Sequence, residues 1–243
     1  MVNSKADIIA RLTREILPLQ GYKPLQQAAM PVNGLDFIEQ AFPQRSFPLA
    51  AIHEFNCPQK EDEAPTGGFI AALLATVLPP SATAVWIGRS PTIFPPALKS
   101  FGLEPDRMIF ISIQKEKDLL WAMEEALKCG GLSAVIGEIR DLSFTASRRF
   151  QLAVEQSNVT GFVLRTAPKQ LNTTASVSRW KISSLPSQAV DDLPGVGFPR
   201  WQVDLDKVRN GKPGSWQLEW ANGKFRQLPA SDTIIHELKK KTG

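Results

Sequence analysis

Short runs of apolar residues alternate with helix-like segments through the first two thirds of the chain, and this alternation most limits its fold. Strands that are buried on both faces of a sheet have continuous apolar sequences. Where such strands alternate with helices, βαβ units build a mostly parallel sheet with helices on both faces. The predicted strands are residues 49–55 (LAAIHEF), 84–87 (AVWI), 108–113 (MIFISI), 133–139 (SAVIGEI) and 160–164 (TGFVL), and the predicted helices are a glycine-led segment from Thr66 and residues 97–101, 116–129 and 145–157.

Beyond Arg165 the apolar runs give way to alternating polar and apolar residues. This pattern covers residues 180–182, 200–209 and 215–220, with Asn-Gly pairs at 210–211 and 222–223. Alternation on both sides of Asn210-Gly211 predicts an antiparallel β-hairpin around this turn. We therefore predict a three-layer α/β domain with a mostly parallel central sheet and a C-terminal antiparallel β meander. Its predicted limits are 34–228, preceded by a helix (Ser4 to about Leu17) and linker in residues 1–33 and followed by a basic tail in residues 229–243.

The composition is that of a globular protein, because 43% of the 243 residues are hydrophobic and 21% are charged. The net charge of +4 is a weak indication of a polyanionic partner, and Lys239, Lys240 and Lys241 supply much of it. Cys57 and Cys129 lie far apart, so they predict neither a zinc site nor a disulfide framework. No signal peptide and no apolar run of about 18 residues is present, so we expect a cytoplasmic protein without membrane contact.

The first strand–helix turn is where an α/β protein of this kind would bind a nucleotide. A working phosphate loop has the pattern GxxxxGK[ST]. This segment has Thr66, Gly67 and Gly68, but Phe69 stands at the position of the lysine, and residues 61–63 are all acidic. We interpret Thr66, Gly67 and Gly68 as a degenerate phosphate loop and expect no bound cofactor.

Glu138 is the one remnant of a magnesium-binding acid, because it ends an apolar strand. We favour a structural role for it, as a strand-end carboxylate that bonds to a neighbouring loop. The only histidines, His53 and His236, form no recognisable catalytic group with a nucleophile. His53 lies within the first strand, so we expect a packed or hydrogen-bonded core residue. The sequence thus predicts no enzyme.

Indications of binding are more coherent. Arg179 and Lys181 flank Trp180, and aromatic side chains between cations can stack on bases while the charges hold phosphates. Residues 148–149 (RR) would extend such a patch if they lay nearby. The alternative places Trp180 in the core with solvated basic neighbours, and we favour it slightly. The tail carries a short apolar stripe that could bind a partner, formed by Ile234, Ile235 and Leu238.

Longer motifs give the chain a family resemblance. Residues 48–55 (PLAAIHEF), 119–139 (LLWAMEEALKCGGLSAVIGEI) and 142–165 (LSFTASRRFQLAVEQSNVTGFVLR) follow one another in the order typical of the ImuA family. Residues 176–182 (SVSRWKI) and 214–220 (GSWQLEW) are similar to its later strands. The chain therefore resembles, over residues 34–228, a bacterial family associated with mutagenic translesion synthesis and, through it, the RecA-like ATPase fold.

The resemblance implies a RecA-like domain without hydrolysis that works as an accessory protein in the SOS DNA-damage response. Its implied partners are an inactive Y-family-like polymerase (ImuB) and an error-prone replicative-type polymerase, together with DNA or RecA. In RecA the segment corresponding to residues 166–175 contacts DNA, so Lys169, Gln170 and Asn172 join Arg179 and Lys181 as candidate DNA contacts.

Three other interpretations stay open at this stage. The chain could be a cell-division inhibitor of the SulA type, which also resembles a RecA-like core without a working phosphate loop. It could be a weak ATPase that depends on Glu138. It could also be a plain DNA-binding protein, whose affinity would fall steeply with salt.

Overall fold

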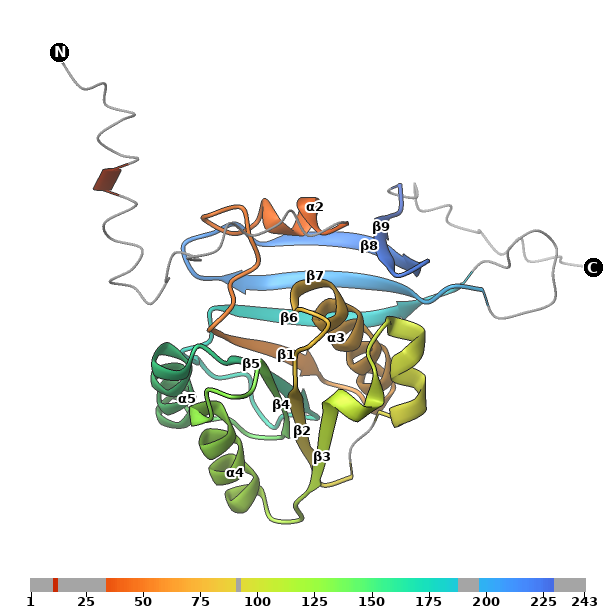
Figure 1. The fold of residues 1–243 in the computed structure, drawn as a ribbon. Helices are drawn as coiled ribbons and strands as arrows, with labels where there is room; N and C mark the ends of the chain where they lie inside the picture. Colours follow the sequence, from red (N-terminus) through yellow and green to blue (C-terminus); the bar gives the residue numbers. More distant parts are fainter. Residues whose placement is uncertain (1–10, 13–33, 91–92, 188–196, 230–243) are drawn as a thin grey trace, which may run out of the picture.

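The computed structural model describes residues 11–12, 34–90, 93–187 and 197–229, and within them nine strands form one sheet (Figure 1). The strand order is β3-β2-β4-β5-β1-β6-β7-β8-β9. Every pairing from β3 to β6 is parallel, and every pairing from β6 to β9 is antiparallel. The predicted mixed α/β fold, mostly parallel with antiparallel strands at the C-terminal end, is confirmed.

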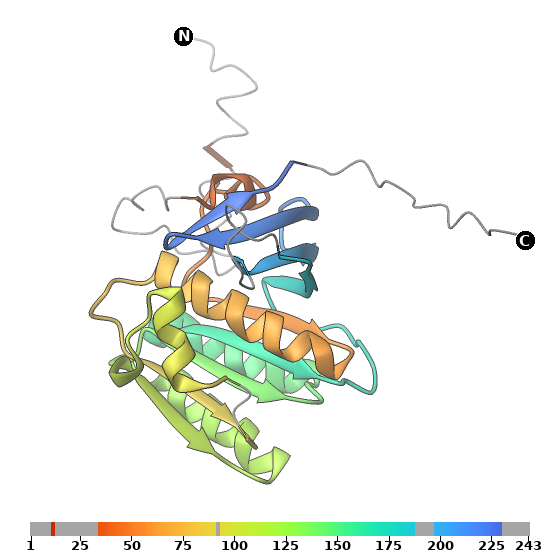
Figure 2. The ribbon, with the colours of Figure 1, turned by 90° about the vertical axis from the view of Figure 1, so that its right-hand side faces the viewer.

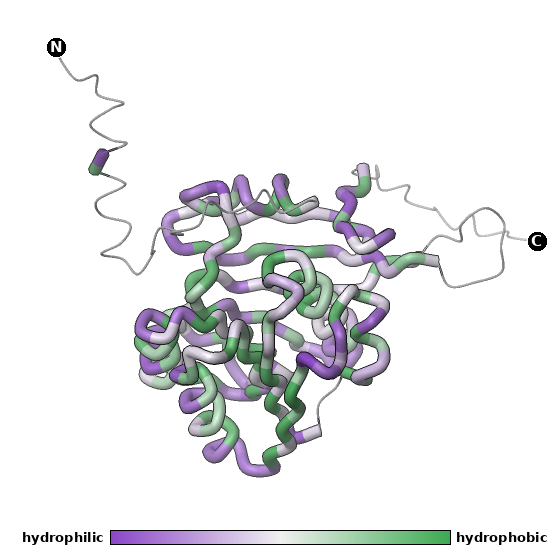
Figure 3. Tube along the Cα trace, viewed as in Figure 1, coloured by the Kyte–Doolittle hydropathy of each residue, from purple (hydrophilic) through white to green (hydrophobic). Residues whose placement is uncertain are grey.

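The central parallel strands are buried along their whole length, as their apolar sequences predict. Successive side chains point to opposite faces, so the strands contribute to two separate hydrophobic cores. Figure 3 shows the apolar stretches of β2 and β3 at the lower end of the sheet. The parallel strands are β1 (Ile52–Cys57), β2 (Ala84–Gly88), β3 (Met108–Ser112), β4 (Ala134–Ile139), β5 (Thr160–Thr166) and β6 (Ser178–Leu185).

Helices cover both faces of this parallel part, as right-handed crossovers require (Figure 2). On one face lies α3 (Glu63–Val77), with the 3₁₀-helices η2 (Pro95–Phe101) and η3 (Pro105–Arg107) beside it. On the other face α4 (Glu116–Lys128) packs against α5 (Phe144–Ser157). The Ser143 hydroxyl accepts a hydrogen bond from the Ala146 N–H and so caps α5.

The C-terminal meander extends the sheet on one side. It consists of β7 (Arg200–Val208), β8 (Gly214–Ala221) and β9 (Lys224–Gln227), and the short helix α2 (Asp36–Glu39) packs on it through Phe37 and Trp216. The predicted hairpin at Asn210-Gly211 is confirmed. We did not predict β9, because this strand is only four residues long. Asn222 and Gly223 at its turn both have positive φ, as a tight hairpin turn requires.

Some predicted limits were wrong. The first strand begins at Ile52 instead of Leu49, because Ala50 has a φ of 52° and cannot continue an extended strand. Residues 97–101 belong to a 3₁₀-helix that begins at Pro95 instead of an α-helix.

Most of the predicted N-terminal helix and nearly all of the predicted basic tail lie outside the described residues. Of the helix, Arg11 and Leu12 are described, and both are helical and exposed. Ile234, Ile235, Leu238 and His236 are not described. Within the described part of the chain, no helix is long and apolar enough to cross a membrane.

Trp180 provides a test of the core. It is fully buried, its ring stacks on Phe55 with centroids 5.9 Å apart, and its N–H donates to the Ser178 hydroxyl. The core interpretation of Trp180 is therefore confirmed.

We expect Trp180→Ala to lower the free energy of unfolding by about 3–5 kcal/mol, because it removes a large buried side chain. Trp121→Ala, at a tryptophan that is 64% exposed, should change it little. Urea denaturation followed by far-UV circular dichroism measures both, and equal losses would contradict this account.

Candidate functional site

The segment after β1 is a helix where the sequence suggested a loop. A single turn of 3₁₀-helix, η1 (Lys60–Asp62), leads directly into α3. Thr66, Gly67 and Gly68 therefore lie inside α3, and all three are buried. The Thr66 hydroxyl donates to the Asp62 carbonyl at 2.6 Å. The helix predicted from Thr66 therefore begins earlier than predicted, at Glu63, and is preceded by η1. The acidic residues start it, because the Asp62 carboxylate accepts the Gln59 N–H at the entry to η1.

One of the two glycines of α3, Gly68, allows an aromatic side chain to pack closely. A Cβ atom at Gly67 would lie 3.9 Å from the Trp86 ring, and one at Gly68 would lie 3.1 Å from the Phe101 ring. Trp86 is fully buried, and its indole N–H donates to Glu138 Oε1 at 2.7 Å. Glu138 thus bonds to a side chain of the neighbouring strand β2, which fits the structural role that we favoured for it. Here the glycines serve side-chain packing.

The surroundings of this segment are acidic and chemically inert. Burial, and then the charge of Glu138, raise the pKa of Glu63. Burial raises the pKa of the Cys57 thiol to about 12, with Asp62, Glu63 and Glu138 adding to the shift. A protonated, buried thiol is a poor nucleophile, and the nearby carboxylates repel an anionic ligand.

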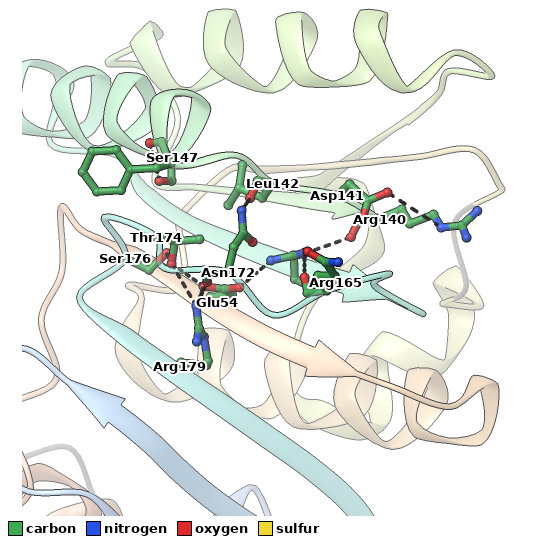
Figure 4. A network of polar contacts seen from close by, with 12 residues as sticks. Glu54, Arg140, Asp141, Leu142, Ser147, Arg165, Asn172, Thr174, Ser176 and Arg179 are labelled. Carbon is green, nitrogen blue, oxygen red and sulfur yellow. Dashed lines mark hydrogen bonds and ion pairs between the residues drawn. The ribbon is translucent and has the colours of Figure 1, made fainter.

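A second polar cluster lies on the opposite face of the sheet, around Glu54 of β1 (Figure 4). The Glu54 carboxylate is fully buried and accepts hydrogen bonds from Arg165 of β5 at 2.8 Å, Arg179 of β6 at 3.2 Å and the Thr174 hydroxyl at 2.6 Å. Parallel pairing places these groups side by side, because β1 lies between β5 and β6. We call Glu54, Arg165, Arg179 and Thr174 the Glu54 cluster.

The Glu54 cluster holds the β5–β6 connection, residues 167–177. Four cations donate to carbonyl oxygens of this connection: Arg165 to Gln170, Arg179 to Asn172, Lys207 to Thr174 and Arg209 to Ala175. Burial, and then the charge of Arg179, lower the pKa of Lys207. The connection is also tied to the start of α5, through Asn172 Nδ2 to the Leu142 carbonyl and the Ala175 N–H to the Ser147 hydroxyl.

Two of the five candidate DNA contacts bond within the protein, and the other three are exposed. Arg179 is directed at Glu54 and is not solvated as we expected, and the Asn172 side chain bonds within the protein. The side chains of Lys169 and Gln170 remain exposed on the connection. Lys181 is exposed farther along β6 and is paired in register with Asp204 of β7. Arg148 and Arg149 are exposed on α5, and Arg149 forms an ion pair with Glu124.

Sequence reasoning missed the Glu54 cluster. Glu54 and Arg165 were visible as charged residues in or next to apolar strands, and a charge buried in a sheet needs a partner. The pairing itself depends on which strands are neighbours, and the sequence does not give that order.

His53 is a core residue, as predicted. Its ring lies between Phe47 and Phe162, with centroids 4.4 and 5.6 Å away. Nδ1 contacts the Ser178 hydroxyl and Nε2 contacts the Pro48 carbonyl, both at 2.7 Å. No group of three or more His, Cys, Asp or Glu side chains suited to a metal ion occurs among the described residues.

Comparisons with known proteins decide the family. No protein-family model matches the chain. Two curated relatives, each called Protein ImuA, come from Caulobacter vibrioides strains NA1000 / CB15N and ATCC 19089 / CIP 103742 / CB 15. Each is 34% identical over 194 residues, which cover 75% of this chain and 80% of the relative. The chain belongs to the ImuA family. Among solved structures, SulA from Pseudomonas aeruginosa aligns with a TM-score of 0.42 and 18% identity, over 49% of this ImuA-family chain and 99% of SulA.

We expect Glu54→Gln to destabilise the protein by about 3–5 kcal/mol, because it leaves Arg165 buried without its counter-charge. Glu125→Gln is the matched control, since Glu125 forms an exposed pair with Lys128 and should matter little. Urea denaturation of the two variants measures the difference. A Glu54→Gln variant as stable as the control would show that the cluster does not stabilise the fold.

His53 makes stability depend on pH. Burial lowers the pKa of its imidazole from 6.5 to about 4, so between these values the unfolded state binds more protons than the folded state. Stability should therefore rise with pH across this range, and the His53 contribution of about 3 kcal/mol should be lost as pH falls from 6.5 to 4. Between pH 4 and 6.5, the free energy of unfolding of His53→Gln should change less with pH than that of wild type. His236→Gln should show the same pH dependence as wild type. A slope unchanged in His53→Gln would contradict the assignment.

Proposed function

We propose that this ImuA-family chain is a non-catalytic accessory protein of error-prone translesion DNA synthesis in the DNA-damage response. Membership of the ImuA family supports the link to damage-induced mutagenesis. The single observation that carries the non-catalytic role is the Trp86–Glu138 hydrogen bond, formed where the ring packs against Gly67. The parallel sheet with its C-terminal meander supports a RecA-like origin of the domain.

The geometry of the glycines argues against phosphate binding. A phosphate loop surrounds its ligand with free backbone N–H groups, and a lysine reaches the terminal oxygens. Here Gly67 and Gly68 lie within a regular helix, buried against aromatic rings, and Phe69 is a buried core residue. A nucleotide would have to displace Trp86 and bring its charge close to Glu63 and Glu138.

The chain would therefore act by binding. Its proposed partners are the polymerases that the family resemblance implies, an inactive Y-family-like polymerase (ImuB) and an error-prone replicative-type polymerase. Contacts with DNA or RecA are secondary in this proposal, because the Glu54 cluster uses Arg179, and Lys181 faces Asp204 with Asp206 close by. Such a surface of mixed charge attracts a polyanion weakly.

We expect Glu138→Gln to restore damage-induced mutagenesis as fully as wild type in a strain that lacks this gene, because Glu138 has no part in hydrolysis. Mutation frequency after ultraviolet irradiation measures the outcome, and Glu63→Gln is the matched control. Loss of restoration in Glu138→Gln alone, with normal protein levels, would favour the weak-ATPase interpretation. Failure of the wild-type gene to restore mutagenesis would contradict the proposed function.

Calorimetry addresses the nucleotide directly. With magnesium and a nonhydrolysable ATP analogue at millimolar concentration, the full-length chain should show no binding heat. Stoichiometric binding would mean that α3 opens to admit a phosphate, and the non-catalytic role would have to be abandoned.

A further inference from the structure

The outer face of α5 carries exposed apolar side chains. Phe144 is 55% exposed and Leu152 is 43% exposed, although shorter polar residues would serve equally well on a solvated helix. Arg148 lies between them at helical spacing, so the three residues form one stripe about 12 Å long. A buried face with Phe150, Ala153 and Val154 holds α5 against the sheet, so this stripe is not needed for the core.

The β5–β6 connection extends this stripe. Its neighbouring residues are fixed to the start of α5, because the Lys169 N–H donates to Asp141 and Asn172 Nδ2 donates to the Leu142 carbonyl. In the sequence, Leu171 lies between these two anchored residues, and it is 56% exposed. The Glu54 cluster and its neighbouring cations hold the backbone on both sides of Leu171 through the Gln170 and Asn172 carbonyls. Leu171 is thus exposed on a backbone that is already ordered, and binding through it costs little conformational entropy.

The charged side chains around these residues are of both signs, but the carboxylates are already bonded: Glu155, three residues after Leu152, accepts a hydrogen bond from the Gln151 side chain. Arg148 and Lys169 are exposed and form no ion pair with any described residue. The nearby carboxylate of Asp141 already accepts the Lys169 N–H and lies 4.0 Å from Arg140. The surface therefore presents three apolar anchors with free cations beside them, and its complement is a segment with apolar and acidic side chains.

We propose that Phe144, Leu152 and Leu171, with Arg148 and Lys169, form a docking surface for an acidic amphipathic helix of a protein partner. Apolar anchors two turns apart match the spacing of one helix face, and acidic residues on its flanks meet the cations. Two aliphatic anchors and only two free cations favour a protein over single-stranded nucleic acid, which is held by aromatic stacking and many phosphate contacts. The inference extends the proposed function by giving the chemistry of the partner segment, but it is tested without the polymerases.

The test uses the full-length chain and a fluorescein-labelled 18-residue helical peptide with leucines on one face and glutamates on the flanks. Fluorescence anisotropy should show binding to wild type. The triple variant Phe144→Ser/Leu152→Ser/Leu171→Ser should weaken it about 30-fold or more, because it removes the central anchors. Arg148→Glu should weaken it at low salt and less so at high salt. Phe94→Ser is the matched control, because Phe94 is 69% exposed and precedes η2 on the opposite face of the sheet, and it should bind like wild type.

Two further probes separate the alternatives. The same peptide with lysines in place of glutamates should bind at least about tenfold more weakly than the acidic peptide. The triple variant should bind a labelled dT20 oligonucleotide with the same affinity as wild type. The proposal is overturned if the acidic peptide does not bind, or if the folded triple variant binds it as tightly as wild type. If the triple variant instead loses binding to dT20 while it keeps binding to the peptide, the surface binds nucleic acid and not a protein helix. None of these results depends on whether the polymerases bind, so failure of the proposed function would be seen separately.

Discussion

The buried carboxylate of Glu54 is the interaction on which the described domain depends most. A charge in the middle of a sheet is costly unless its hydrogen-bonding capacity is fully used. Here Arg165, Arg179 and Thr174 supply the donors, and they come from β5, β6 and the connection between these strands. Because β1 lies between β5 and β6, one side chain bonds to both neighbouring strands and to the connection between them.

The connection in turn relies on this cluster. A crossover without a helix has few internal hydrogen bonds, so its carbonyl groups need partners from elsewhere. Four cations meet that need, and the start of α5 supplies further contacts. The β5–β6 connection is therefore fixed on its inner side, while residues 169–173 are exposed on its outer side.

The opposite face of the sheet shows how a ligand-binding position of an α/β fold can become part of the core. Gly68 allows Phe101 to approach α3, and Trp86 uses Glu138 of β4 as its hydrogen-bond acceptor. The aromatic packing continues through Phe69 to Trp201 and Phe225 of the meander. The same helix thus joins the parallel sheet to its antiparallel extension.

The sequence by itself determined the α/β class, the C-terminal hairpin, the burial of His53 and Trp180, and the absence of a phosphate-binding lysine. These features depend on local periodicity, on Asn-Gly turns and on which residue types are present. Only the tertiary structure decided that Gly68 packs against Phe101, that Arg179 bonds to Glu54, and that the Asn172 side chain bonds to the Leu142 carbonyl. Each of these depends on the order of strands in the sheet, which brings together residues that are more than 20, and in one case 125, positions apart. Local patterns contain no information on such contacts, because they arise only when the crossovers set which strands become neighbours.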